Sequence, residues 1–488
     1  MASGCNRLQL QASHSSPLNR RDVITIALLI LTVLVTKWSI LPTPYHWDEM
    51  GAYFEPARWL SARSLWDMLP GRHPAELFFG HPPLLYLLSA ALFKLFNATP
   101  LVAHAVAIFF ASLGVLYTYL LGRFLVSFRV GLGGAILLFS FPLYFAQSGM
   151  LLGDIPITAL GVMAVYYRVL GKSFVYTFCA TLMVLTKETS ILLVLILILV
   201  ETVQVLKGGK RWQLLLSHLM PVLALTIFFV MQKIYTGSFL PNPFFQHDSL
   251  VTLVPGRLLW KGAFACYWAF FAQWRFLLTG TIIVACIRMH WRPPDFFLLF
   301  AGISLAYVLA FTCIYFLPRY MLLVAPFVSL AAAASLNFMF TDSRKYFLGL
   351  ALPVVLAVAI PPYKQSGFDS FETTMQYLDV IGANKSAAYF LENNHAGKTV
   401  LASWPLMSVL ADPGFGYVKK PVTVTTDVNA CWDLIAVSPQ GDQKMVNSLR
   451  QVIAEHHLTL LRAFTNNGKV VEIYQWQKKG QQKGKIGC

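Results

Sequence analysis

The chain has 488 residues, of which 57% are hydrophobic and 12% are charged. A soluble domain is typically about 45–50% apolar and about 25% charged, so this composition excludes a single water-soluble domain and indicates a polytopic membrane protein. The formal net charge of +16 comes largely from basic residues in short connections between apolar segments. Such residues set membrane topology and contact anionic lipids, so we expect no nucleic-acid partner.

Apolar runs of membrane-spanning length recur along the chain as far as residue 360. The first follows a basic N-terminal tail (1–21) with no small-residue cleavage site after it, so we expect an uncleaved first span. The runs are 23–41, 101–121, 130–147, 155–170, 173–186, 190–206, 213–234, 262–287, 296–316, 321–340 and 346–360. The predicted fold is therefore a polytopic α-helical membrane domain over residues 22–361, with about 11 to 13 transmembrane helices.

Positive charge falls on alternate connections between these runs, which the positive-inside rule makes cytoplasmic. The basic groups are Arg20/Arg21, Arg123/Arg129, Arg168/Lys172, Lys207/Lys210/Arg211, Arg288/Arg292 and Arg344/Lys345. The alternation holds only if the short apolar run 84–96, within the first outer loop (42–100), lies in the interface; if it crosses, every later assignment inverts. We expect a multi-pass protein of the bacterial inner membrane, with its active site outside the cytoplasm.

The residues after 361 mix polar and apolar positions. Segments 399–402, 422–424, 434–437 and 470–474 have the pattern of strands, and segments 374–393 and 442–457 have the pattern of helices. The prediction is a soluble α/β domain over residues 362–477 on the outer side. A Lys/Gln/Gly-rich tail (478–488) is expected to be disordered.

Two adjacent carboxylates, Asp48 and Glu49, follow the first span within the aromatic segment Tyr45–Phe54. A carboxylate at a bilayer surface suits a general base acting on a lipid-linked substrate. Glu49 would hold the acceptor or separate the two pKa values, because close carboxylates push each other's pKa apart. The alternative is a solvated pair, or an N-cap for a helix beginning near Tyr53.

Further polar residues occur where other apolar runs begin or are interrupted. Asp154 is either a helix N-cap or an active-site acid, and both roles are compatible. Lys187 either binds a phosphate or pairs with its neighbour Glu188. The guanidinium of Arg319 suits binding to two oxygens of a lipid phosphate. The alternative is that Arg319 is an interfacial anchor beside Tyr320.

The first outer loop carries His81, followed by two prolines, and a basic set that includes Arg58. His81 is either a substrate ligand or part of a proline-fixed helix entry. Arg58 would attract an anionic substrate, although a solvated loop face explains it equally. A lone His and cysteines without a CxxC spacing predict no zinc site. No cofactor is assigned, and a divalent cation is left open.

Taken in order, the motifs Asp48-Glu49, His81-Pro82-Pro83-Leu84, Asp154, Leu185-Thr186-Lys187-Glu188 and Arg319-Tyr320 resemble those of the GT-C integral-membrane glycosyltransferases. Within that superfamily the chain looks most like the protein O-mannosyltransferases and lipid A aminoarabinose transferases. The resemblance covers most of the chain. It implies that Asp48 matches the catalytic Asp of the family, and that a second acidic residue often stands at the position of Asp154.

The resemblance also implies the reaction. Such enzymes pass a sugar, with inversion, from a polyprenyl-phosphate carrier to an acceptor at the outer membrane face. The expected partners are a polyprenyl-phosphate-linked sugar donor, membrane lipids and a glycan, lipid or protein acceptor. The residues do not specify which sugar or which acceptor is used.

Two other classes of protein fit a basic, polytopic chain. A transporter or flippase would show two similar halves and ionisable or broken helices near the bilayer midplane. Here no halves match, and the charges lie at helix ends. A binding module with a membrane anchor would not need eleven spans, so the enzyme is the favoured interpretation.

Overall fold

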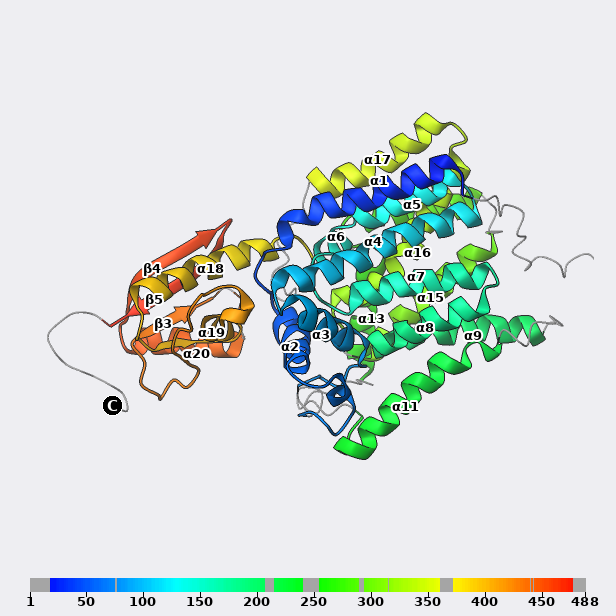
Figure 1. Ribbon diagram of the computed structural model, residues 1–488. Helices are drawn as coiled ribbons and strands as arrows, with labels where there is room; N and C mark the ends of the chain where they lie inside the picture. The colour runs from blue at the N-terminus through cyan, green and yellow to red at the C-terminus, as the bar shows by residue number, and fades with distance from the viewer. Residues whose placement is uncertain are drawn as a thin grey trace, which may run out of the picture.

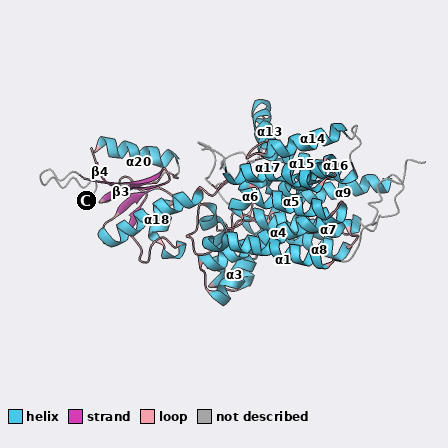
Figure 2. Ribbon diagram, turned by 90° about the horizontal axis from the view of Figure 1, so that it is seen from above, coloured by secondary structure: helices cyan, strands magenta, loops and turns pink. Residues whose placement is uncertain are grey.

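A computed structural model describes residues 18–74, 77–206, 215–239, 254–288, 294–314, 316–359, 372–438, 440–441 and 443–476. Most helices form one bundle, and a small α/β domain stands beyond one end of it (Figure 1). Figure 2, turned by 90°, shows the same two parts. The prediction of a helical membrane part followed by a C-terminal α/β domain is confirmed.

The bundle is built from helices of very different lengths. Its α-helices are α1 (Arg20–Lys37), α2 (Glu55–Ser61), α3 (Leu84–Phe96), α4 (Pro100–Leu125), α5 (Phe128–Ser140), α6 (Pro142–Gln147), α7 (Asp154–Val169), α8 (Ser173–Thr186), α9 (Ile191–Leu206), α11 (Leu219–Thr236), α13 (Pro255–Phe270), α14 (Arg275–Arg288), α15 (Asp295–Cys313), α16 (Ala325–Met339) and α17 (Ser343–Ala359). Short helices of other types are η1 (Trp38–Ile40), η2 (Glu49–Phe54), η3 (Leu65–Met68), η4 (Glu188–Ser190) and η5 (Pro318–Val324).

Six helical segments of the described chain are long and apolar enough to cross a membrane, and the bent pair α13–α14 would make a seventh. They are Arg20–Ile40, Pro100–Leu125, Glu188–Leu206, Leu219–Thr236, Asp295–Cys313 and Pro318–Met339. The chain is therefore a multi-pass membrane protein, but the expected count of about eleven spans is not confirmed.

Two expected spans are broken. The run 130–147 divides into α5 and α6 at Phe141, because Pro142 has no amide hydrogen and starts a new helix. The run 262–287 is two helices that meet at 83°, since Gln273 and Trp274 between them have left-handed backbone conformations, with φ of 52° and 70°. The prediction of one continuous span there is wrong.

Several basic connections gather at one end of the bundle. At the start of α1, Asp22 accepts from Arg123 Nε at 2.6 Å, which brings the C-terminal end of α4 beside it. Nearby, Arg129 donates to the Thr341 carbonyl at 2.8 Å. In Figure 1, α1 runs from this end toward the α/β domain. The basic connections that carry Arg123 and Arg129 thus lie at one end of the bundle, and their cytoplasmic assignment stays a prediction.

Helix α3 has 13 residues and is therefore about 20 Å long, shorter than a hydrocarbon core of about 30 Å. It packs against α2 at the end of the bundle that faces the C-terminal domain (Figure 1). Its location in the membrane interface stays a prediction.

The C-terminal domain has a five-stranded sheet in the order β2-β1-β3-β5-β4. Its strands are β1 (Val400–Ala402), β2 (Val424–Thr425), β3 (Leu434–Val437), β4 (Thr459–Asn466) and β5 (Lys469–Gln475), with β1 parallel to β2 and β3 and the remaining pairs antiparallel. Helices α18 (Tyr377–Asn394) and α20 (Gln443–Glu455) lie on opposite sides of the sheet (Figure 2), and α19 (Leu406–Ala411) follows β1.

The four expected strands and two expected helices of this domain are present. Helix α19 and strand β4 were not predicted from the sequence. Strand β4 was hidden because an irregularity between Leu460 and Arg462 interrupts its alternation of inward and outward residues.

Candidate functional site

Three carboxylates converge on the guanidinium of Arg319 at the start of η5. One terminal nitrogen bonds to Asp48 and the other to Glu372, while Nε lies 3.3 Å from Asp154 Oδ2. The side chains of Arg319, Asp154 and Glu372 are 8%, 2% and 2% exposed, whereas that of Asp48 is 32% exposed. Because Arg319 turns inward to carboxylates, the interpretation as an interfacial anchor is wrong.

Lys187 extends the same group. Its Nζ is 2.7 Å from Asp154 Oδ1 and 4.3 Å from the ring centroid of Tyr320, a cation–π geometry. The alternative interpretation, a mutual ion pair of Lys187 and Glu188, does not describe the structure, because the Lys187 backbone is extended between α8 and η4 and the two side chains take different partners. Glu188 instead lies 2.9 Å from Nδ1 of His81.

Neither Asp154 nor Asp48 caps a helix with its side chain. Helix α7 begins at Asp154 itself, after Gly153 as N-cap, and Asp48 precedes η2 without a capping hydrogen bond. The N-cap interpretations are therefore wrong. Both carboxylates are instead directed to Arg319.

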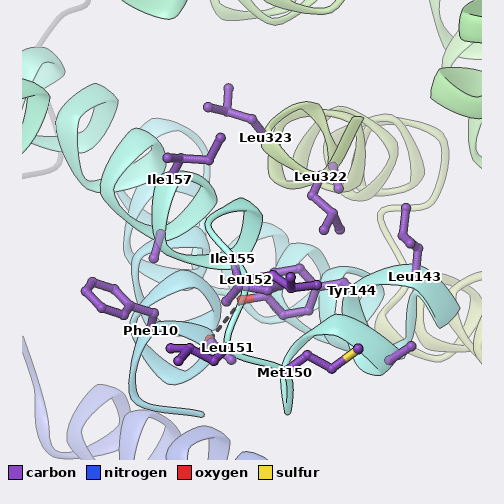
Figure 3. Close-up of a cluster of buried hydrophobic side chains, with 14 of the residues drawn as sticks. Phe110, Leu143, Tyr144, Met150, Leu151, Leu152, Ile155, Ile157, Leu322 and Leu323 are labelled. Atoms are coloured by element: carbon purple, nitrogen blue, oxygen red, sulfur yellow. Dashed lines mark hydrogen bonds between the residues drawn. The ribbon is translucent and has the colours of Figure 1, made fainter. Parts of the chain in front are cut away.

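An apolar cluster fixes the distance between Asp154 and Arg319. Figure 3 shows Leu151, Leu152 and Ile155, from the segment around Asp154, grouped with Leu322 and Leu323 of η5. These five side chains are at most 1% exposed. Close packing of this kind leaves little room for movement, so the two ionised groups are held on a rigid base.

Glu49 points away from the group around Arg319. Its Oε1 accepts from the Leu151 amide at 2.7 Å and lies 3.0 Å from His104 Nε2, and its Oε2 accepts from the His46 amide at 3.2 Å. These contacts hold the segment that carries Asp48. A catalytic role for Glu49 stays a prediction.

Arg58 is also outside the group. It bonds to Asp412 of the C-terminal domain at 2.5 Å, and its guanidinium lies 4.9 Å from the Phe54 ring centroid. The structure thus brings Asp48, Asp154, Lys187, Arg319 and Tyr320 together, while Glu49, His81 and Arg58 are partners of neighbouring segments.

Glu372 was missed by the sequence analysis. It lies before α18, in a stretch that was assigned to the separate soluble domain, and no local pattern marks it. Its carbonyl accepts from Gln147 Nε2 at 3.0 Å, and the next carbonyl, of Thr373, accepts from Gln273 Nε2 at 2.8 Å. Two side chains of the bundle therefore hold this connection at the site.

Two further buried basic side chains flank α6. Lys37 is fully buried, with Nζ 3.3 Å from the ring centroid of Phe145. Arg275 is 3% exposed, and its guanidinium lies 3.8 Å from the Phe141 ring centroid. Within the described chain neither contacts a carboxylate. Lys37 interrupts the first apolar run, which is a sequence signal for function that was overlooked.

The charges of the central group do not cancel. Asp48, Asp154 and Glu372 face Arg319 and Lys187, so the formal charges leave one negative charge. In the described part of the chain no three His, Cys, Asp or Glu side chains gather as a metal site requires. Since Arg319 and Lys187 already bind these carboxylates, the donor set does not fit the divalent cation that the sequence left open.

No protein-family model matches the chain, and no curated protein matches it by sequence. Among solved structures, ArnT from Cupriavidus metallidurans in the apo state is 14% identical, with a TM-score of 0.61 over 93% of this chain and 98% of that one.

The same protein bound to undecaprenyl phosphate matches with a TM-score of 0.58 and 14% identity over 92% of this chain and 97% of that one. An oligosaccharyltransferase from Archaeoglobus fulgidus, AglB, matches with a TM-score of 0.48 and 11% identity over 86% of this chain and 69% of that one. As the motifs predicted, the chain has the fold of the GT-C integral-membrane glycosyltransferases.

Proposed function

We propose that this protein is an inverting glycosyltransferase that moves a sugar from a polyprenyl-phosphate carrier to an acceptor at the outer face of the membrane. The observation that carries the proposal is the accessibility of the Asp48 carboxylate. Of the three carboxylates on Arg319, it is the one with substantial exposure, at 32%. The resemblance to ArnT, one structure of which holds undecaprenyl phosphate, supports the class of carrier.

Asp48 acts as the general base. An acceptor hydroxyl gives its proton to Asp48 while its oxygen bonds to the anomeric carbon, and the bond from that carbon to the phosphate oxygen breaks with its electron pair on the phosphate. Arg319 holds Oδ2 of Asp48, so Oδ1 is the proton acceptor. Attack opposite the leaving phosphate inverts the anomeric centre.

The donor phosphate has two candidate pairs of cations. The sequence favoured Lys187 and Arg319 as the residues that bind the phosphate, but in the structure both are bound to carboxylates. Lys37 and Arg275 contact no carboxylate of the described chain. Both lie near the connection that carries Glu372: Lys37 contacts Met375 of that connection, and Gln273, two residues before Arg275, donates to the Thr373 carbonyl. We assign Lys187 and Arg319 to positioning the carboxylates, and Lys37 and Arg275 to the phosphate, because an unpaired cation gains most from an anion.

An apolar cavity of about 770 Å³ supplies room for a lipid chain. It is bounded by α1 from Thr25 to Thr36, by α5 and α17, and by Thr374 and Met375 near Glu372. The part of α1 from Thr25 to Thr36 rises about 17 Å along the helix axis, which is half or more of the thickness of a hydrocarbon core. This cavity suits the isoprenoid of the donor or the chain of a lipid acceptor.

The test uses purified full-length protein in lipid with a panel of polyprenyl-phosphate sugars and envelope acceptors. Wild type should transfer a sugar, and Asp48→Asn should lower turnover by roughly 10²–10⁴-fold, because the amide keeps the shape but cannot take the proton. Asp427→Asn, at an exposed turn of the C-terminal domain, is the matched control. Near-wild-type turnover in Asp48→Asn contradicts the assignment, and movement of the donor across liposomes without any sugar transfer favours a flippase.

A further inference from the structure

Two tryptophans meet beside Asp48, one from each part of the molecule. Trp47 directly precedes Asp48, and Trp404 lies in the C-terminal domain between β1 and α19. Their ring centroids are 4.5 Å apart, with an interplanar angle of 61°. Both indoles are half-buried, whereas Tyr45 and Glu49 on either side of the segment are buried. The exposed indole surface therefore lies next to the accessible carboxylate.

The backbone holds Trp47 in an unfavourable conformation. Its φ is 49°, in the left-handed region that β-carbon sterics disfavour. Two contacts of the C-terminal domain hold the backbone at Tyr45, on the N-terminal side of Trp47: the Tyr45 amide donates to the Phe415 carbonyl at 3.2 Å, and the Tyr417 hydroxyl donates to the Tyr45 carbonyl at 2.9 Å. The orientation of Trp47 toward the C-terminal domain is thus fixed by the fold.

Tryptophans near a membrane also serve as interfacial anchors. That role does not explain this pair, because Trp404 belongs to the domain that stands beyond the end of the bundle (Figure 1). An indole face carries negative charge density, so the C–H groups on one side of a sugar ring lie favourably against it. The hydroxyl groups at the ring edge then remain free for polar partners such as Asp48.

We propose that Trp47 and Trp404 form a stacking wall for a sugar ring at Asp48, so that the C-terminal domain supplies a residue that determines substrate specificity. This inference rests on the proposed glycosyl transfer and adds the ring-binding surface to it. The ring is that of the donor sugar or of a glycan acceptor, and the chemistry of recognition is the same for both.

The variants are Trp404→Ala and Trp404→Phe, made in the full-length protein, with Trp66→Ala as control because Trp66 is 70% exposed and lies in the first outer loop. Trp404→Ala should raise one KM by roughly tenfold, the equivalent of a stacking interaction. Trp404→Phe should restore most of the affinity, since it keeps an aromatic face, and Trp66→Ala should leave both KM values unchanged.

The KM values for donor and acceptor show whether the bound sugar ring belongs to the donor or to the acceptor. A raised donor KM, also seen in donor hydrolysis without acceptor, assigns the ring to the donor; a raised acceptor KM alone assigns it to the acceptor. Unchanged KM values in an active Trp404→Ala protein, with only its melting temperature lowered, overturn the inference. If wild type transfers no sugar, the proposed function fails, and the wall is still tested by quenching of indole fluorescence with two probes, short-chain prenyl-phosphate mannose for the donor and a mannose oligosaccharide for a glycan acceptor. Equal quenching in wild type and in the Trp47→Phe, Trp404→Phe double variant then overturns it.

Discussion

Arg319 positions the proposed base through a bond that few other side chains could make. Its planar fork binds Asp48 and Glu372 with different nitrogens while Nε faces Asp154. A lysine carries the same charge but cannot offer donors in this fixed geometry. The position of Asp48 therefore depends on the shape of the guanidinium as well as on its charge.

This dependence leads to a kinetic prediction that separates Arg319 from Arg275. Arg319→Lys should lower kcat by at least about tenfold with little change in donor Kd, because the base is misplaced while the phosphate site is intact. Arg275→Gln should instead weaken donor binding, because an unpaired buried cation is removed. Single-turnover rates and equilibrium binding of the lipid donor measure the two effects.

Arg58→Ala is the control for this comparison. Its pair with Asp412 is partly exposed on both sides, at 36% and 31%, and such pairs contribute about 0–1 kcal/mol. It should change neither kcat nor donor Kd by more than about twofold. If Arg319→Lys weakens donor binding and Arg275→Gln does not, the phosphate lies on Arg319 as the sequence suggested.

Part of this site could be predicted from the sequence. Asp48, Asp154, Lys187 and Arg319 stand at ends or interruptions of apolar runs, where a charge is conspicuous, and they meet because those ends lie on one face of the bundle. Glu372 could not be found, because its bond to Arg319 spans 53 residues of chain and it stands in a mixed polar and apolar segment rather than at the end of an apolar run.

At the scale of elements, the segment that carries Asp48 is clamped between η2 and the C-terminal domain. His46 Nε2 lies 3.2 Å from Gln440 Nε2, and burial lowers the pKa of His46 to about 3, although Asp48 acts in the opposite direction. The imidazole is thus neutral in the docked state, with Nε2 accepting from the Gln440 amide. Docking of the C-terminal domain therefore depends on an uncharged His46.

The sign of the resulting pH dependence follows from linkage. The folded pKa lies below the ordinary value of 6.5, so the undocked state binds the proton more tightly. The stabilisation is complete above about pH 6.5 and is lost progressively as the pH falls toward about 3.

We expect hydrogen exchange at residues 45–48 to lose protection between pH 7 and pH 5, with a slope of at most about 1.4 kcal/mol per pH unit. His46→Asn should flatten this dependence, whereas His457→Asn, away from the interface, should not. An identical pH profile in wild type and His46→Asn would show that another group titrates.

The elements themselves were predictable where apolar periodicity was uninterrupted. Helix α8 matches its expected bounds at Ser173–Thr186, and β3 matches at Leu434–Val437. The sharp bend between α13 and α14 was not predictable, because the amide of Leu143 and the carbonyl of Thr373, both distant in sequence, bind the Gln273 side chain that the bend presents. Tertiary hydrogen bonds, rather than local propensity, make that break.

For the whole molecule, the orientation in the membrane decides which substrates can reach Asp48. Two ion pairs mark opposite ends of the bundle: Arg123 is bound to Asp22 at the start of α1, and Arg58 is bound to Asp412 of the C-terminal domain beyond the other end (Figure 1). The bias of Lys and Arg toward the cytoplasm predicts that the site and the C-terminal domain lie outside. Carrier lipids would present their sugar on that side.

Cysteine labelling in intact cells tests this orientation. In a cysteine-free background, Ala396→Cys lies at an exposed turn of the C-terminal domain, and Lys172→Cys lies at the exposed turn between α7 and α8. Because α7 starts in the site at Asp154 and runs 16 residues away from it, Lys172 belongs to the basic end. An impermeant maleimide added outside should therefore label Ala396→Cys and leave Lys172→Cys unlabelled until the membrane is permeabilised. The reverse pattern would invert the topology, and it would require the sugar to be taken from a carrier in the cytoplasmic leaflet, so that the reaction would precede the export of its product.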